Sequence, residues 1–217
     1  EIKKNFNRDA IVINNAIDHT IFYCDGEKKR DKKKEFVITI IGSENNEFKR
    51  INDIKQALSI VEAQGYQFKL IWVTPDEPIN QMGTVLVNPK QSQIGSFLRE
   101  SDLFICASLY ESFSLPVLEA MASGCGVITT ENKGVIEYAV NNKNCIMIAM
   151  NDPEDLAEKI IQVFEDDALR NKIILEGLKT ASNYKWDNII SQIMEYYQKI
   201  SAFVPKRDEE MGKYEKR

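Results

Sequence analysis

The chain has 217 residues, of which 43% are hydrophobic and 28% charged, and its formal net charge is −5. These values are typical of a globular protein with one large domain or two small ones, and the negative charge argues against nucleic acid as a partner. No apolar run approaches the roughly 18–20 residues that cross a bilayer. A single histidine, His19, argues against a zinc site or a Ser-His-Asp triad.

The cysteines give an expectation about the compartment. Cys24, Cys106, Cys125 and Cys145 show no C-x-x-C spacing, and Cys106 lies in an apolar segment. We therefore expect four reduced thiols in a cytoplasmic protein. The first residues show no signal peptide and no initiator Met, so we expect a fragment or a processed chain.

The N-terminal part is expected to begin with a linker over residues 1–9, followed by a short strand at Ile11–Asn14 and a turn. Residues 27–34 (EKKRDKKK) contain six basic and two acidic side chains. Such a stretch is either a solvated loop or a contact with an anionic membrane surface, and a location at the inner face of the membrane would suit the second reading.

A first strand–helix unit follows. Phe36–Ile41 is apolar and rich in β-branched residues, as in a buried parallel strand. Apolar residues then recur at helical spacing over Lys49–Gln64, which predicts a helix ended by Gly65. Lys49 and Arg50 put two cations at the helix start, where the dipole disfavours them, so we expect an anionic group nearby. The alternative is an exposed basic pair.

The remaining elements are predicted by the same patterns of periodicity and turn residues. They are strands at Phe68–Val73, Thr84–Val87 and Ile146–Ala149, helices at Gln93–Glu100, Gly134–Val140, Leu156–Phe164 (with its start at Asp152–Asp155) and Asp167–Ala181, and an amphipathic terminal helix from Tyr184 to Ile200. We expect one domain over residues 10–201 and a charged, disordered tail over residues 202–217.

The stretch from residue 101 to residue 130 has the densest signal. An apolar strand (Leu103–Ala107), a polar loop (residues 108–114), a helix (Leu115–Ser123) and a second apolar strand (Val127–Thr130) follow one another. Strand, loop, helix and strand in this order build a parallel α/β sheet with helices on its faces.

The helix in this stretch is apolar nearly all round, so it is expected to be buried. Pro116 suits its first turn, and Ser112 or Ser114 is expected to cap it. The remaining N–H groups are a favourable seat for a phosphate. Glu111 precedes this anion site, and Glu119 lies within the helix, where a carboxylate is costly unless something binds it. A ligand with phosphates in the middle and hydroxyls at both ends, such as a sugar nucleotide, fits this order.

The segment ESFSLPVLEAMASG, from Glu111 to Gly124, resembles the glutamate–seven residues–glutamate motif of retaining glycosyltransferases with the two-domain GT-B fold, the large fourth family that includes sucrose synthase. Ser112 and Ser114 stand where the family has glycines, and so does Arg50 at the earlier helix start. The likeness extends more weakly from Val12 to Ile200. It implies a Rossmann-like parallel sheet with helices on both faces, the C-terminal, donor-binding half of a GT-B fold.

The resemblance also implies roles for single residues. Glu111 would hold the sugar hydroxyls and act in catalysis together with Lys49, while Glu119 would bind the ribose hydroxyls. Main-chain N–H groups around the helix start would bind the diphosphate, and the backbone after the Thr84–Val87 strand would border the base. The binding residues implied in this way are Ser112, Phe113, Ser114, Leu115, Gly42, Ser43, Arg50, Val87, Asn88, Pro89 and Ile94.

The expected function is donor binding in glycosyl transfer from a nucleoside diphosphate sugar to a glycan, lipid-linked or protein acceptor. Catalysis would need an N-terminal GT-B domain or a partner chain, and no metal or other cofactor is expected. One alternative is a non-catalytic nucleotide-binding subunit, favoured by Ser43 at the place of the family's arginine. A second is a related nucleotide-sugar epimerase. The plain structural alternative makes Glu111 part of a loop salt bridge and Glu119 a helix-face carboxylate.

Overall fold

The computed structural model describes residues 2–7, 10–26 and 34–203. The basic stretch at 27–33 and the tail from residue 204 onward therefore lie outside the described residues. The chain divides into two compact units. One contains residues 17–183 and holds the whole sheet, and the other combines residues 1–16 with residues 184–217.

The sheet of the larger unit has six strands in the order β3-β2-β1-β4-β5-β6, and every neighbouring pair is parallel. This confirms the predicted Rossmann-like sheet. Its strands are β1 (Phe36–Ile41), β2 (Phe68–Thr74), β3 (Thr84–Val87), β4 (Leu103–Cys106), β5 (Gly126–Thr130) and β6 (Ile146–Ile148).

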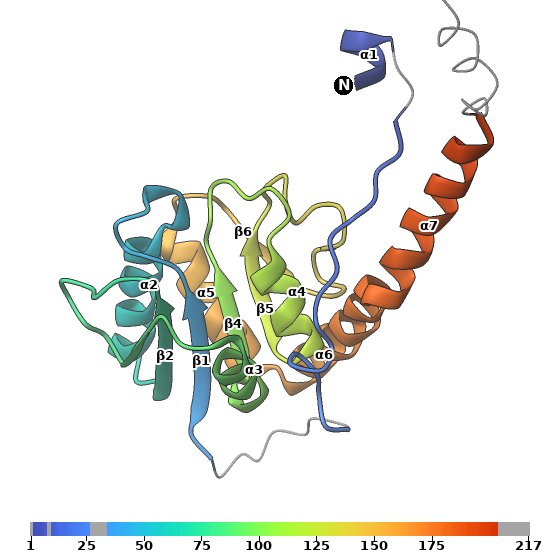
Figure 1. Cartoon of the computed structure of the whole chain (residues 1–217). Helices are drawn as coiled ribbons and strands as arrows, with labels where there is room; N and C mark the ends of the chain where they lie inside the picture. The colour runs from blue at the N-terminus through green and yellow to red at the C-terminus, as the bar shows by residue number, and fades with distance from the viewer. Residues whose placement is uncertain (1, 8–9, 27–33, 204–217) are drawn as a thin grey trace, which may run out of the picture. The chain divides into compact units, whose positions relative to one another are not determined.

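Helices cover both faces of this sheet (Figure 1). α2 and α5 pack together on one face, while α4 and α6 pack together on the other, with α3 beside α4. Their bounds are α2 (Ile51–Ala63), α3 (Gln91–Glu100), α4 (Leu115–Ala122), α5 (Pro153–Glu165) and α6 (Asp167–Ala181). Short 3-10 helices lie at Glu47–Lys49 and Ser182–Tyr184.

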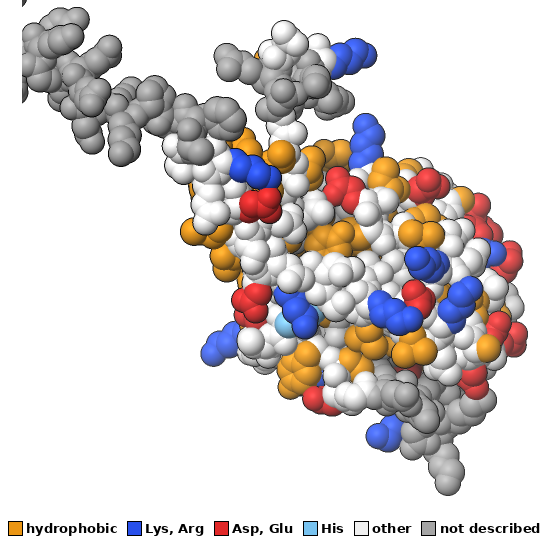
Figure 2. Space-filling model, turned by 90° about the vertical axis from the view of Figure 1, so that its right-hand side faces the viewer, with side chains coloured by type: hydrophobic (Ala, Val, Ile, Leu, Met, Phe, Trp, Pro, Cys, Tyr) orange, Lys and Arg blue, Asp and Glu red, His pale blue; other side chains and the backbone are white. Residues whose placement is uncertain are grey.

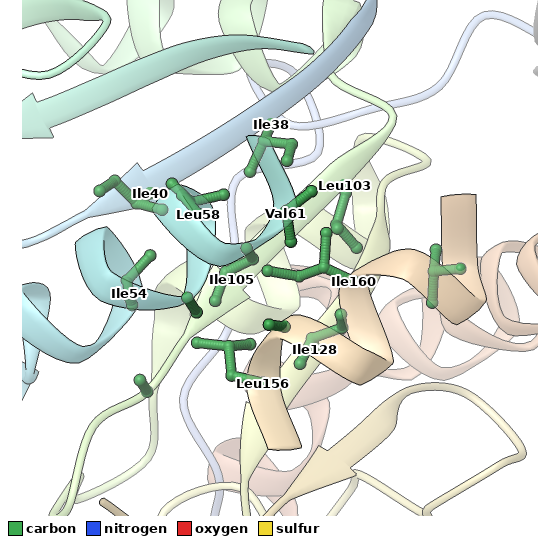
Figure 3. Close-up of a cluster of buried hydrophobic side chains, with 14 of the residues drawn as sticks. Ile38, Ile40, Ile54, Leu58, Val61, Leu103, Ile105, Ile128, Leu156 and Ile160 are labelled. Carbon is green, nitrogen blue, oxygen red and sulfur yellow. The ribbon is translucent and has the colours of Figure 1, made fainter. Parts of the chain in front are cut away.

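The main core lies between the sheet and the pair α2 and α5 (Figure 3). Isoleucines and leucines of β1, β4 and β5 point toward apolar side chains of the two helices. The residues at the centre are Ile38, Ile40, Leu103, Ile105, Ile128, Ile54, Leu58, Val61, Leu156 and Ile160. Strands buried on both faces carry continuous apolar runs, which is why these segments read as strands without alternation.

The smaller unit contains α1 (Ile2–Phe6) and α7 (Trp186–Phe203). α7 confirms the predicted terminal helix. The linker over residues 1–9 was expected to have no regular structure, but α1 lies within it. In the described part of the chain, no helix combines the length and the apolar character that crossing a bilayer requires. On the face in Figure 2, acidic and basic side chains are interspersed, without a large area of one sign.

Two short elements were predicted wrongly. Ile11–Asn14 is not a strand, because Ile11 and Val12 are 54% and 78% exposed and no described strand pairs with them. Gly134–Val140 is a series of turns rather than a helix. The amides of Val135 and Ile136 donate to the Asn132 carbonyl and those of Tyr138 and Ala139 donate to the Val135 carbonyl, which are separate turns and not a continuous helical ladder.

Candidate functional site at the switch point of the sheet

The site lies where the order of the strands reverses. β1 and β4 are neighbours in the sheet although two strands separate them in sequence. At such a point the loops after the two strands diverge to opposite faces and leave a crevice at the carboxyl edge, the usual ligand position in open α/β sheets. Here the loop after β1 carries Gly42, Ser43 and Lys49, and the loop after β4 carries Glu111.

The two loops are joined by an ion pair. Lys49 Nζ donates to Glu111 Oε1 at 2.7 Å, and the two side chains are 27% and 14% exposed. Lys49 ends the 3-10 helix that Asn46 caps by accepting from the Phe48 amide. The Leu109 amide donates to the Phe48 carbonyl at 2.8 Å, so the backbones of the loops are also tied together. The sequence thus brings the two proposed catalytic residues into direct contact.

Lys49 does not belong to α2, contrary to the predicted helix over Lys49–Gln64. Arg50 separates the 3-10 helix from α2 with a left-handed backbone, φ 51° and ψ 38°. This conformation favours glycine, which is what the family carries at this position. The Arg50 guanidinium makes two 2.8 Å bonds to the Asp53 carboxylate. The anionic groups expected near the two cations are therefore Glu111, beside Lys49, and Asp53, beside Arg50.

A pocket of about 330 Å³ opens beside the ion pair. Residues from the loop after β1 form one wall, and the ends of β2 and β3 with the start of α3 form the rest. The predicted site residues in its lining are Gly42, Ser43, Lys49, Asn88, Pro89 and Ile94, and the lining residues that sequence reasoning missed are Ile41, Asn46, Val73, Thr74 and Pro75. The residues predicted for the base and for the diphosphate thus border one space.

The Gly42 backbone is held on both sides within this wall. Its amide donates to the Val73 carbonyl at 2.9 Å, and its carbonyl accepts from the Trp72 indole at 2.8 Å. A Cβ at Gly42 would lie 3.1 Å from Ile51 Cδ1 and 3.2 Å from Lys49 Cβ. Trp72, fully buried, therefore fixes the loop start that carries Lys49.

Ser43 occupies the place of the family's arginine and binds a carboxylate instead. Its hydroxyl donates to Asp76 Oδ2 at 2.9 Å, and Asn45 Nδ2 donates to the same oxygen at 2.8 Å. The Thr74 hydroxyl lies 3.0 Å from Asp76 Oδ1. The hydrogen bonds from Asn45 and Ser43 hold the pKa of Asp76 below its usual value. Asp76 had no sequence signal, because its partners lie about thirty residues away.

The start of α4 lies on the β4 side of the switch point, and its residues do not line the pocket. Phe113 and Ser114 are buried, Leu115 is half-buried and Ser112 is exposed. Ser114 takes the N-cap position with φ 54° and ψ 62°, a left-handed backbone that explains why the family has glycine there. The expected side-chain cap is absent: in this backbone the Ser114 hydroxyl faces Cys106 Sγ at 3.9 Å instead of the helix amides.

Glu119 lies one turn further along α4 and is half-buried. Burial raises the pKa of its carboxyl to about 7. No residue in the described ranges donates a hydrogen bond to this carboxyl or pairs with it. The oxygens of a half-buried carboxylate without donors can accept further hydrogen bonds, and the hydroxyl groups of a ligand would be suitable donors.

The pocket lining includes neither Glu111 nor seven of the predicted binding residues, which are Glu119, Ser112, Phe113, Ser114, Leu115, Arg50 and Val87. Val87 is half-buried at the end of β3, Arg50 turns to Asp53, and Ser112 is exposed. His19 Nε2 donates to the Ala181 carbonyl, 3.2 Å away, which gives His19 a structural contact. None of the four cysteines, all within the described residues, forms a disulfide.

These features define a parallel α/β domain with a charged crevice at its switch point, and comparison places the chain in a family. The sequence model described as "Glycosyl transferases group 1" matches residues 25–180. The chain therefore belongs to the group 1 glycosyl transferases, which confirms the family resemblance.

Three similar proteins show the extent of the match. The uncharacterized glycosyltransferase MJ1178 of Methanocaldococcus jannaschii is 23% identical over 212 residues, which are 93% of this chain and 57% of that protein. The chain thus spans just over half the length of this curated relative. The C-terminal domain of the group 1 protein LpcC from Francisella tularensis has a TM-score of 0.65 and 23% identity, over 78% of this chain and 99% of that domain.

The third is Alr3699/HepE of Anabaena, whose structure was solved in complex with UDP-glucose. It has a TM-score of 0.71 and 19% identity, over 87% of this chain and 57% of that one. Together with the LpcC domain, it confirms the fold as that of the C-terminal half of a GT-B glycosyltransferase.

Proposed function

We propose that this chain binds the nucleoside diphosphate sugar from which a retaining glycosyltransferase moves a sugar to an acceptor. The base would lie in the pocket beside Asn88 and Ile94, and Glu119 would accept hydrogen bonds from the ribose. Lys49 and the amides at the start of α4 would face the diphosphate, and Glu111 the sugar. Negative charge grows on the diphosphate as it leaves, so donors fixed there favour the transition state.

One observation carries this proposal. At the carboxyl edge of the sheet, a cation–carboxylate pair borders a pocket, while a second carboxylate without a partner among the described residues lies on the neighbouring helix. A loop salt bridge alone would account for Glu111. It gives no reason for Glu119, whose burial costs free energy that a ligand would recover.

The test is calorimetric titration of the chain with UDP, GDP and ADP and with their glucose derivatives. Glu119→Ala should weaken binding of the preferred nucleotide by about 1–3 kcal/mol, because a buried, hydrogen-bonded contact is lost. Glu62→Ala, an exposed glutamate on α2, is the matched control and should bind as the unaltered chain does. Equal affinity of all three proteins would rule out the role of Glu119. Binding should persist in EDTA, since the proposal involves no metal.

Transfer itself would need an N-terminal GT-B domain or a partner chain, so we expect the chain to be inactive alone. A second candidate is a non-catalytic nucleotide-binding subunit. It is favoured by Ser43, which stands where the family has arginine, carries no charge and binds Asp76. The full-length gene product separates the two. Turnover with a panel of sugar nucleotides supports the transferase, and nucleotide binding without turnover in the presence of its partner chain supports the subunit.

We also propose a cytoplasmic location, where four thiols stay reduced. Contact with the inner face of the membrane would depend on residues 27–34, with six basic side chains. Sedimentation with vesicles that contain anionic phosphatidylserine should then capture the chain, and vesicles of phosphatidylcholine alone should not.

A further inference from the structure

The loop that carries Glu111 is held from one side by the segment that follows β5. We call residues 130–139 the brace segment. At its start, the hydroxyl of Thr130 and the side-chain amide of Asn132 both donate to the carbonyl of Ser108, the first residue of the Glu111 loop. All three residues are buried, so these bonds are shielded from water. The brace segment therefore fixes where the Glu111 loop leaves β4.

Tyr138 fixes the other end of the loop. Its hydroxyl donates to the Ser114 carbonyl at 2.9 Å, and its ring packs against Phe113 with the ring centroids 5.6 Å apart. The Ser114 carbonyl also accepts from the Val117 amide in the first turn of α4, at 3.1 Å. Tyr138 is 6% exposed, so its hydroxyl is a buried donor directed at the residue that opens the helix.

This contact acts on a strained residue. Ser114 has φ 54° and ψ 62°, a left-handed region that is unfavourable for a residue with a Cβ. Such a conformation persists only where its surroundings hold it. It sets the direction of the peptide groups on both sides of Ser114, which are among those we assign to the diphosphate. A bond to the Ser114 carbonyl is therefore a bond that maintains the anion site.

Gly134 supports the middle of the loop. A Cβ at this position would lie 2.6 Å from Glu111 Cβ and 2.6 Å from the Glu111 carbonyl oxygen. The backbone of the brace segment thus touches the backbone of Glu111 directly. The brace is itself fixed to α6 through Asn144, whose side-chain amide donates to the Tyr138 carbonyl at 2.7 Å and lies 2.8 Å from the Thr180 hydroxyl.

We propose that Tyr138 and Gly134 are positioning residues. Tyr138 holds the start of α4 in the form that binds phosphate, and Gly134 allows Glu111 the close approach that places its carboxylate at the sugar. Neither residue needs to touch the ligand. The inference rests on the proposed function, because it assigns these residues to the same donor site.

The first test is Tyr138→Phe, which keeps the packed ring and removes only the hydroxyl. Affinities for UDP and for uridine are measured by calorimetry on the whole chain, with GDP and guanosine or ADP and adenosine if those bind better. The ratio of diphosphate to nucleoside affinity should fall about fivefold, the effect of one lost hydrogen bond. Nucleoside affinity should stay unchanged, because the base pocket is lined by other elements.

Tyr66→Phe is the matched control. The Tyr66 hydroxyl donates to Glu165, near the C-terminal ends of α2 and α5, and neither residue lines the pocket. The variant also loses one tyrosine hydroxyl, and it should keep the ratio of the unaltered chain. A general loss of stability would lower both affinities together, whereas a positioning role changes their ratio.

The second test is Gly134→Ala, which forces Glu111 away from the brace segment. It should reduce the preference for UDP-glucose over UDP about fivefold or more, since Glu111 is assigned to the sugar. Gly83→Ala is the control, because its Cβ would meet the Leu70 carbonyl at 2.5 Å outside the pocket. A similar loss of stability without a change in sugar preference is expected there.

The outcomes separate the two proposals. If the unaltered chain binds none of the nucleotides, the proposed function fails and the inference fails with it. If the unaltered chain binds a nucleotide and both brace variants keep its two affinity ratios, the positioning roles are wrong and the proposed function stands.

Discussion

The two sides of the crevice satisfy their polar groups in opposite ways. On the β1 side, Lys49 is paired with Glu111, Arg50 with Asp53 and the Ser43 hydroxyl with Asp76. On the β4 side, Glu119 has no partner in the described part of the chain. On the β1 side, Ser43 and Arg50 differ from the family's residues, and each binds a carboxylate of this chain. On the β4 side, both glutamates of the family motif are present. Ligand recognition should therefore depend on the β4 side, with Lys49 as the contribution of the β1 side.

Removal of Lys49 should have the largest effect. Lys49→Gln takes away the one ammonium that lines the pocket as the structure describes it, and charge-assisted contacts contribute about 1.5–3 kcal/mol. UDP affinity should fall about 10–100-fold, and uridine affinity should stay the same. Lys69→Gln, an exposed lysine of β2, serves as control. If UDP affinity survives the loss of Lys49, the diphosphate does not lie at the ion pair.

The unpartnered carboxylate gives a prediction about pH. The pKa of Glu119 is raised to about 7 from its ordinary value of 4.5, so the folded state holds this proton more tightly than the unfolded state. Stability from the protonated form is fully present below about pH 4.5 and is lost as the pH rises through 7. Glu119→Gln should therefore equal the unaltered chain at pH 4 and exceed it by about 1–3 kcal/mol at pH 8.

Urea unfolding at pH 4, 6 and 8 measures this difference, with Glu62→Gln as the exposed control. The gain in stability should be accompanied by weaker nucleotide binding at pH 8, because glutamine cannot accept ribose hydrogen bonds at two oxygens. A constant difference between variant and unaltered chain across the three pH values would contradict the assigned burial of the charge.

The smallest expected effect tests whether Arg50 replaces the arginine missing at Ser43. Arg50→Gly removes the guanidinium but suits the left-handed backbone, so relief of strain and loss of the Asp53 pair should cancel to within about 1 kcal/mol. Since the guanidinium is held by Asp53, UDP affinity should not change. A clear drop in affinity would show that Arg50 leaves Asp53 to bind the diphosphate.

The strands and long helices of the fold were predictable because their signal is local. Apolar β-branched runs marked β1 and β2, and helical periodicity marked α2 and α5, within a few residues of the observed bounds. The predictions for the two short elements, Ile11–Asn14 and Gly134–Val140, were wrong because they too used only local signal. The run at Ile11–Asn14 has strand composition, but a strand also needs a neighbour to pair with, and composition does not report one.

The site was predictable where a motif continues along the chain and unpredictable where partners are distant. The family motifs assigned Lys49 and Glu111 to one site, but their direct ion pair, between residues 62 positions apart, was not predicted. Asp76 and Tyr138 act on residues 24 to 33 positions away, and nothing in their own neighbourhood indicates it. Ser114 and Arg50 both occupy positions where the family has glycine. Their left-handed backbone explains why glycine is found there, and this could be learned only from the structure.

The backbone hydrogen bonds of Gly42 limit what this residue can contribute to nucleotide binding. Both main-chain hydrogen-bonding groups of Gly42 are already used by Val73 and Trp72. The Gly42 amide therefore has no hydrogen left to donate to a bound nucleotide, and a side chain at this position would crowd Ile51 and Lys49. Gly42→Ala should accordingly leave the choice among bases unchanged while shifting Lys49, which we assign to the diphosphate.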